Sequence, residues 1–371
     1  MSDPASEQTG DGGAGTDTTA AGEPVRPPDA PEGSGGPEEP AGPASAPDDA
    51  HDPAPASARV EVPEAPQGFR AGFVCLVGRP NTGKSTLTNA LVGTKVAITS
   101  GRPQTTRHNV RGVVHREDAQ LVLVDTPGLH RPRTLLGRRL NDLVRETLAD
   151  VDVIAFCLPA NERIGPGDRY IARDLAGLRA PVVAVVTKTD TVSRQALAAQ
   201  LLAVDALGDW ADIVPVSAVR GEQVGVLTDV LVSHLPPSPP LYPTGEVTDE
   251  PVEVMVAELV REAALEGVRD ELPHSLAVVV DEIVDPRSAR ERGSRVKGSG
   301  NRLQVRVSLV VERDSQKAIV IGRGGARLKE VGVRARAGIE RLLGRRVYLD
   351  LHVRTARDWQ SDPRALARLG F

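Results

Sequence analysis

The chain has 371 residues and a formal net charge of −5, but its charge is unevenly distributed. Residues 1–66 carry 2 Arg and 14 Asp or Glu, whereas residues 286–371 carry 21 Lys or Arg and 8 Asp or Glu. The length suits two domains and a tail better than one compact domain. The 2 cysteines lie in apolar runs, which excludes a disulfide-stapled secreted scaffold. No apolar run approaches the roughly 18 residues that span a bilayer, and no signal peptide is evident, so we expect a soluble, cytoplasmic protein.

Residues 1–68 are predicted to form a disordered, acidic arm rich in Pro, Gly and Ala. Residues 1–66 contain no Leu, Ile, Phe, Tyr or Trp, and 22 of them are Pro or Gly. Such a segment cannot bury enough apolar area to offset the entropy of ordering it. We expect a solvating or spacer arm without chemistry of its own; a regulatory tail is the alternative.

Residues 69–235 alternate apolar, β-branched runs with helix-like segments. This pattern predicts an α/β domain with a mostly parallel sheet and helices on both faces. Val110–His115 and residues 120–124 look like an antiparallel hairpin at the sheet edge. Helices are expected at residues 85–92, 135–149, 168–178, 194–207 and 224–235. Five prolines among residues 235–243 then predict a stiff linker, 236–250, and a domain boundary.

Residues 78–85 read Gly-Arg-Pro-Asn-Thr-Gly-Lys-Ser and fit the phosphate-loop pattern G-x4-G-K-S between a strand and a helix. Backbone N–H groups of such a loop converge on phosphate oxygens, and glycine allows the close approach. Lys84 would lie near the β- and γ-phosphates, and the Ser85 hydroxyl is the expected Mg²⁺ ligand. An ordinary glycine-rich turn is the alternative. The predicted nucleotide contacts here are Gly78, Arg79, Pro80, Asn81, Thr82, Gly83, Lys84, Ser85 and Thr86.

Asp125-Thr126-Pro127-Gly128 follows an apolar run, so Asp125 lies at the carboxyl end of a predicted strand. Ligands bind at that edge of open α/β sheets. Asp125 can hold Mg²⁺ through water, and Gly128 can offer its N–H to the γ-phosphate. Taken alone, this tetrapeptide is also a plausible turn.

Two later segments suggest which base is bound. A carboxylate at Asp190 can accept two hydrogen bonds from guanine, a donor pair that adenine lacks. The loop beginning at Ser217 can turn a backbone N–H toward guanine O6. The predicted base contacts are Thr187, Lys188, Thr189, Asp190, Ser217 and Ala218.

Residues 73–235 resemble a translation-factor-class GTPase domain, and two stretches resemble the Era family: Gly-Arg-Pro-Gln-Thr-Thr-Arg-His (101–108) and Asp-Thr-Pro-Gly-Leu-His (125–130). The resemblance implies that Thr106, rather than Thr105, closes on Mg²⁺ when the γ-phosphate is present. It also implies a potassium ligand at Asn81, for which a hydrogen-bonding turn residue is the alternative. The predicted metal ligands are Ser85, Thr106 and Asp125, and the predicted catalytic residues are Lys84, Thr106 and Gly128.

Two positions depart from the commoner GTPase pattern. Thr187 stands where Asn is usual, which weakens the expected contact to guanine N7. Leu129, also a predicted nucleotide contact, stands where many GTPases have a water-orienting Gln. Hydrolysis is therefore expected to be slow unless a cation, another residue or a partner completes the site.

Residues 251–371 show the order α-β-β-α-α-β and resemble a type II KH module. Its G-x-x-G loop would be Gly322–Gly325, beside which about four single-stranded nucleotides bind. The next helix carries an apolar stripe of residues 328, 331, 335, 339 and 342. A helix–helix turn is the alternative interpretation of the loop, and an auxiliary RNA contact is the alternative to a mobile loop at 286–302. The predicted RNA contacts are Gly322, Arg323, Gly324, Gly325, Arg327 and Lys329.

Residues 70–371 as a whole resemble the Era family in motif order. The resemblance implies a monomeric, GTP-switched factor that binds small-subunit (16S) rRNA near its 3′ end and assists maturation of the 30S subunit. It also implies peripheral contact with the cytoplasmic face of the membrane. One alternative is a constitutive RNA-binding protein whose GTPase domain is structural or regulatory only. An ATP-dependent enzyme acting on RNA is a second, which Asp190 disfavours.

Overall fold

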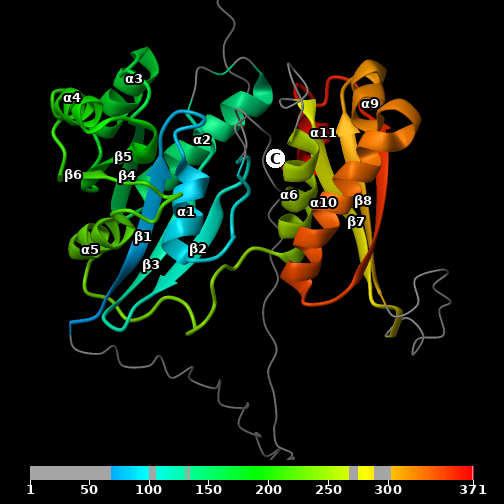
Figure 1. Cartoon of the computed structure of the whole chain (residues 1–371), viewed down its shortest axis with the longest axis horizontal. Coiled ribbons are helices and arrows are strands. Elements are labelled where there is room, and N and C mark those ends of the chain that lie inside the picture. The colour runs from blue at the N-terminus through cyan, green and yellow to red at the C-terminus, as the bar shows by residue number, and fades with distance from the viewer. Residues whose placement is uncertain are drawn as a thin grey trace, which may run out of the picture. The chain divides into compact units, whose positions relative to one another are not determined.

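The computed structural model describes residues 68–99, 106–129, 132, 134–266, 275–287, 302–369 and 371 (Figure 1). All of them belong to Glu61–Phe371, one of the two units into which the chain divides. The acidic arm predicted for residues 1–68 lies outside the described residues except for Gly68, as does most of the run 286–302. In the described part of the chain, no helix is long and apolar enough to cross a lipid bilayer.

Within the ranges that the structure describes, six strands form the first sheet, in the order β2-β3-β1-β4-β5-β6. Every neighbouring pair is parallel except β2 with β3, so the antiparallel hairpin at the sheet edge is confirmed. Strands β3, β4 and β5 are buried along their whole length, as in sheets covered on both faces. The strands are β1 (Arg70–Val77), β2 (Val110–His115), β3 (Ala119–Asp125), β4 (Val153–Pro159), β5 (Val182–Thr187) and β6 (Asp212–Pro215).

Helices cover both faces of this sheet (Figure 1). Along β1, Val74 and Leu76 join one core and Cys75 and Val77 the other, following the two-residue period of a strand. All five predicted helices are present, with ends shifted by no more than three residues. The first core is shared with α1 (Lys84–Val92) and α5 (Val224–His234), and the second with α2 (Leu135–Ala149), α3 (Pro166–Leu175) and α4 (Arg194–Asp205).

The second sheet, as far as the described residues extend, has three strands in the order β7-β8-β9, with β8 antiparallel to β7 and parallel to β9. Helices cover one face of this sheet, and the α-β-β-α-α-β order of the KH prediction is confirmed. Val331, Ala335 and Ile339 of the predicted apolar stripe are buried in this core. The elements are α6 (Val252–Leu265), β7 (Ala277–Val284), β8 (Leu303–Val311), α9 (Asp314–Ile321), α10 (Ala326–Leu343), β9 (Val347–Thr355) and α11 (Pro363–Arg368).

Residues 246–250, at the end of the predicted linker 236–250, lie along the edge strand β2. The N–H of Val113 donates to the carbonyl oxygen of Val247 at 2.9 Å. The Thr248 hydroxyl donates to the carbonyl oxygen of Arg111 at 2.6 Å. The segment therefore satisfies part of the hydrogen-bonding edge of β2, which an open sheet would otherwise expose.

Gly112 lies in β2 where the end of α1 packs closely. A Cβ atom at Gly112 would lie 2.7 Å from Cγ2 of Val92 and 3.1 Å from Cγ2 of Val96. We expect Gly112→Ala to lower the free energy of unfolding by about 1–3 kcal/mol, because overpacking forces neighbouring atoms to shift. Urea denaturation followed by circular dichroism measures the change.

Gly177→Ala is the matched control, because an added Cβ atom there has no neighbour within 4 Å. Its stability is expected to stay within about 0.5 kcal/mol of the parent. If Gly112→Ala were as stable as Gly177→Ala, the packing of α1 on β2 would not restrict this position.

Candidate functional site

The phosphate-loop sequence forms the connection between β1 and α1. Three of its residues have positive φ angles: Gly78 at 156°, Asn81 at 64° and Gly83 at 93°. Lys84 is buried, and its ammonium donates to the carbonyl oxygens of Gly78 at 3.3 Å and Arg79 at 3.1 Å. The loop therefore curls around Lys84, the first residue of α1. The N-terminus of a helix after such a loop favours phosphate binding, because its backbone N–H groups have no partners within the helix.

Three oxygen-bearing side chains meet beside the first turn of α1. Oγ of Ser85 lies 2.9 Å from Oγ1 of Thr106, which donates to Oδ2 of Asp125 at 3.2 Å. The other carboxylate oxygen of Asp125, Oδ1, is buried and has no hydrogen-bond partner within the described residues. Oxygen ligands of this kind suit Mg²⁺. We call Ser85, Thr106 and Asp125 the hydroxyl–carboxylate corner.

The corner contains one carboxylate and two hydroxyls, which distinguishes it from transition-metal sites. Among the residues that the structure describes, no group of three or more His, Cys, Asp or Glu side chains could hold a metal ion. Burial raises the pKa of Asp125 above its usual range, although Lys84 and the hydroxyls of Ser85 and Thr106 oppose the shift. A nearby cation would reverse it, because a positive charge favours the ionised carboxylate.

The Asp125–Gly128 segment packs directly on the phosphate loop. The N–H of Leu129 donates to the carbonyl oxygen of Gly78 at 3.1 Å. A Cβ atom at Gly128 would lie 2.6 Å from the backbone nitrogen of Pro80, so only glycine allows this approach. The side chain of Leu129 is buried in the core shared with α2, α3 and α4, and its predicted nucleotide contact stays a prediction.

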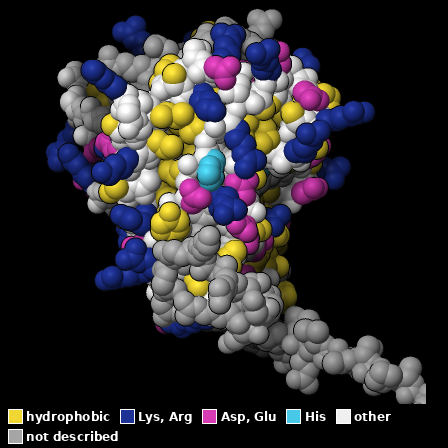
Figure 2. Space-filling model, turned by 90° about the vertical axis from the view of Figure 1, so that its right-hand side faces the viewer, with side chains coloured by type: hydrophobic (Ala, Val, Ile, Leu, Met, Phe, Trp, Pro, Cys, Tyr) yellow, Lys and Arg dark blue, Asp and Glu magenta, His cyan; other side chains and the backbone are white. Residues whose placement is uncertain are grey.

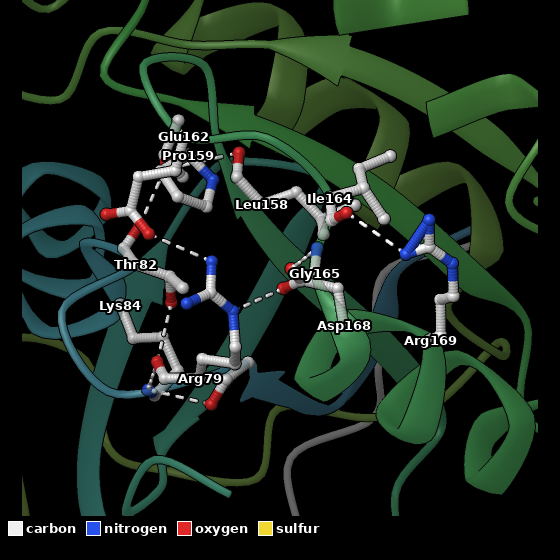
Figure 3. A network of polar contacts seen from close by, with 12 residues as sticks. Arg79, Thr82, Lys84, Leu158, Pro159, Glu162, Ile164, Gly165, Asp168 and Arg169 are labelled. Carbon is white, nitrogen blue, oxygen red and sulfur yellow. Dashed lines mark hydrogen bonds and ion pairs between the residues drawn. The ribbon is translucent and has the colours of Figure 1, made fainter. Parts of the chain in front are cut away.

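The side chain of Arg79 turns away from the phosphate loop and pairs with acidic residues that sequence reasoning missed (Figure 3). Its Nε donates to Oδ1 of buried Asp168 at 2.7 Å, and its Nη2 to Oε2 of Glu162 at 2.9 Å. Oδ2 of Asp168 accepts the N–H of Gly165 at 2.8 Å, at the start of α3. The loop is thereby tied to α3, and the only local signal was an acidic residue three positions after that helix cap.

The residues predicted to read the base are Thr187–Asp190, which begin with the last residue of β5, and Ser217 and Ala218, which follow β6. Oγ of Ser217 donates to Oδ1 of Asp190 at 2.7 Å, and the N–H of Arg220 donates to the same hydroxyl at 3.2 Å. This bond joins the two loops and orients the carboxylate. Thr187 is buried, and its hydroxyl donates to the carbonyl oxygen of Thr82 at 2.6 Å. Thr187 thus connects the base-reading segment to the phosphate loop.

The G-x-x-G loop joins α9 to α10. Gly322, Gly324 and Gly325 have φ angles of 72°, 59° and 78°, a region that side chains other than glycine seldom adopt. Arg323 is exposed at the loop, and Lys329 is exposed on α10. Arg327 instead donates from Nη2 to the carbonyl oxygens of Ala264 at 3.1 Å and Glu266 at 2.9 Å. These bonds provide hydrogen-bond donors for carbonyl groups at the C-terminal end of α6.

Comparison with known families identifies both halves of the chain. Residues 73–188 match the family model described as a 50S ribosome-binding GTPase, and residues 271–360 match the KH domain model. The GTPase Era of Mycolicibacterium paratuberculosis (strain ATCC BAA-968 / K-10) is 66% identical over 306 residues, which cover 82% of this chain and 99% of that protein. The GTPase Era of Streptomyces coelicolor is 64% identical over 308 residues, 81% of this chain and 95% of that protein.

A solved structure of Era in complex with MgGDPNP and nucleotides 1506–1542 of 16S ribosomal RNA is similar, with a TM-score of 0.76 and 35% sequence identity. The match covers 81% of this chain and 99% of that one. A substituted form of Aquifex aeolicus Era bound to GDP·AlF₄⁻ matches with the same TM-score, identity and coverage. A P-loop GTPase fold, a KH fold and these relatives agree: the chain belongs to the Era family of GTPases.

Proposed function

We propose that this GTPase binds GTP and GDP together with Mg²⁺ at the phosphate loop and the hydroxyl–carboxylate corner. The observation that carries the proposal is the meeting of Ser85, Thr106 and Asp125 beside the loop, where one buried carboxylate oxygen has no partner among the residues that the structure describes. In the proposal, Mg²⁺ supplies charge neutralisation for the β- and γ-phosphates. The three side chains of the corner would hold it.

The residues of this chain then have separate roles. Lys84 would move its ammonium from the loop carbonyls of Gly78 and Arg79 to the phosphates, and the N–H of Gly128 would donate to the γ-phosphate. Leu129 is buried, so no side chain at that position orients water. We propose that the catalytic role of the missing water-orienting side chain is taken by potassium bound at Asn81, by another residue or by a partner.

We propose that Asp190 selects guanine. Its carboxylate, held by Ser217, would accept hydrogen bonds from N1–H and the exocyclic amine of the base. The N–H of Ala218 would face guanine O6, since the N–H of Ser217 donates to the carbonyl oxygen of Glu222 at 3.1 Å. Thr187 contributes through its bond to Thr82, which holds the base-reading segment against the phosphate loop.

Replacing Asp190 by Asn tests the guanine assignment. We expect Asp190→Asn to lose its preference for guanine and to bind xanthine nucleotides, because xanthine presents a carbonyl acceptor where guanine presents an amine donor. Competition of GTP, XTP and ATP against a fluorescent GDP analogue measures the preference. Equal competition by ATP and GTP for the parent protein would refute the assignment.

We propose that the KH half binds small-subunit rRNA near its 3′ end and that the protein assists maturation of the 30S subunit. The similar Era structure holds nucleotides 1506–1542 of 16S rRNA. Here the glycine loop permits close approach of an RNA backbone, and Arg323 and Lys329 are exposed beside it. Lys and Arg side chains are abundant on the face in Figure 2, which favours phosphate contacts. Arg327, engaged with α6, would act mainly by shaping the loop.

We further propose that the protein works as a monomer in the cytoplasm, where ribosomal subunits are assembled. The peripheral contact with the cytoplasmic face of the membrane that the resemblance implies stays a prediction. No helix in the described ranges would anchor it by spanning the bilayer.

Comparing RNA affinity between nucleotide states tests whether the GTPase half acts as a switch. Arg107, the residue next to Thr106, donates to the carbonyl oxygen of Leu276 in the KH half at 2.7 Å. A movement of Thr106 in the hydroxyl–carboxylate corner would therefore change a contact with that half. We expect affinities with GDPNP and GDP to differ by about fivefold or more. Fluorescence anisotropy on an rRNA 3′-end oligonucleotide measures both. Equal affinities would favour the constitutive RNA-binding alternative.

Two carboxylates in the G-x-x-G loop test the RNA site. We expect Arg323→Asp with Gly324→Asp to abolish RNA binding, because the carboxylates repel phosphates and add bulk where the backbone approaches. GTP affinity measured without RNA should stay within about twofold, since neither substitution touches the nucleotide site. Lys84→Ala is the reciprocal variant: it should lose nucleotide binding and keep the RNA affinity of the empty state. Parent-like RNA binding by the acidic variant at moderate salt would refute the assignment of RNA binding to the G-x-x-G loop.

A further inference from the structure

The two residues immediately after Thr106 are held by aromatic rings from the end of the chain. Arg107 is only 1% exposed, and its guanidinium carbon lies 5.8 Å from the ring centroid of Trp359 and 5.9 Å from that of Phe371. The ring of His108 stacks on Phe371, with centroids 5.0 Å apart and planes 10° apart. We call Trp359 and Phe371 the aromatic platform.

The platform is itself anchored. The rings of Trp359 and Phe371 stack with centroids 5.9 Å apart, and Nε1 of Trp359 donates to the carbonyl oxygen of Ser275 at 3.1 Å. Nη1 of Arg139 in α2 donates to the main-chain oxygen of Phe371 at 2.7 Å. Leu136 and Leu140 of α2 pack in one apolar cluster with Trp359 and Phe371. The platform therefore contacts both the residues next to Thr106 and the first helix after the Asp125–Gly128 segment.

Displacing Arg107 would remove the contacts that compensate for the burial of its charge. Its guanidinium keeps its positive charge in proteins, although the side chain is buried. A buried charge is tolerated only when partners compensate for lost water. Here the compensation comes from the Leu276 carbonyl at 2.7 Å and from the faces of two rings. Moving Arg107 would remove both.

We infer that Phe371 and Trp359 are positioning residues for the hydroxyl–carboxylate corner. By holding Arg107 and His108, they keep Oγ1 of Thr106 within 2.9 Å of Ser85 and 3.2 Å of Asp125. Adjacent Cα atoms are about 3.8 Å apart and cannot separate, so a displacement of Arg107 carries Thr106 with it. The inference rests on the proposed function, since it concerns the metal dependence of GTP hydrolysis at that corner.

Phe371→Ala in the full chain tests the inference. We expect the Mg²⁺ concentration for half-maximal GTP hydrolysis to rise about fivefold, the scale on which a lost aromatic pair shifts an equilibrium. GDP affinity at saturating Mg²⁺ should stay within about twofold, because the base and phosphate-loop contacts come from other segments. A Mg²⁺ titration of single-turnover hydrolysis and a fluorescent GDP titration measure the two quantities.

Phe371→Tyr keeps the ring and should restore the parental Mg²⁺ midpoint, which a merely structural role would not require. Tyr348→Ala is the control, since Tyr348 is an aromatic of β9 that is 48% exposed; it should titrate like the parent. Should Phe371→Ala unfold, His108→Leu removes the stack from the other side and should raise the midpoint similarly.

The outcomes separate the two proposals. A parent that hydrolyses GTP with Mg²⁺, together with a folded Phe371→Ala or His108→Leu variant of parental midpoint, would overturn the inference alone. A parent with no Mg²⁺-dependent hydrolysis would overturn the proposed function and the inference with it.

Discussion

Parallel pairing of β1 with β3 and β4 is the constraint on which the nucleotide site depends. The register sets Leu76 opposite Asp125 and Val77 opposite Phe156, so the strands end at one edge. The phosphate loop follows β1, the Asp125–Gly128 segment follows β3 and the base-reading segment follows β5. Because both faces of these strands are buried, a slip of one residue would move each side chain into the opposite core, where the close packing is built for other side chains. The core therefore sets the positions of residues that never enter it.

Local patterns could be predicted from the sequence, and contacts between distant residues could not. The phosphate loop, the hairpin and the helix stripe of the KH half each depend on residues a few positions apart. The partner of Arg79, by contrast, is Asp168, 89 positions away, and the hydroxyl of Thr187 meets a carbonyl 105 positions away. Neither pairing leaves a periodic or compositional trace. These intramolecular partners could therefore not be predicted from the sequence, and the nucleotide contacts of Arg79 and Thr187 stay predictions.

Contacts between the GTPase half and the KH half could not be predicted from the sequence for the same reason. Glu262 of α6 accepts hydrogen bonds from the N–H of Thr99 at 3.0 Å and from its hydroxyl at 3.3 Å, and it pairs with Lys95. Arg107 is held by Leu276 and the aromatic platform. Thr99 and Thr106, which flank residues 100–105, thus both lie next to contacts made by the KH half. No single motif predicts these contacts, because the two residues of each contact belong to different domains.

The buried pair of Lys84 and Asp125 also bears on how the proposed ligands act on one another. Burial lowers the pKa of Lys84 and raises that of Asp125, so the protein interior disfavours both charged forms, although each charge supports the other. Phosphate groups beside Lys84 would favour its ammonium, and a divalent cation beside Asp125 would favour its carboxylate. A ligand that keeps the Lys84 ammonium charged therefore also favours the charged carboxylate of Asp125, and the converse holds for a cation beside Asp125. Since coupling between two binding equilibria is reciprocal, nucleotide and metal must raise each other's affinity by the same factor.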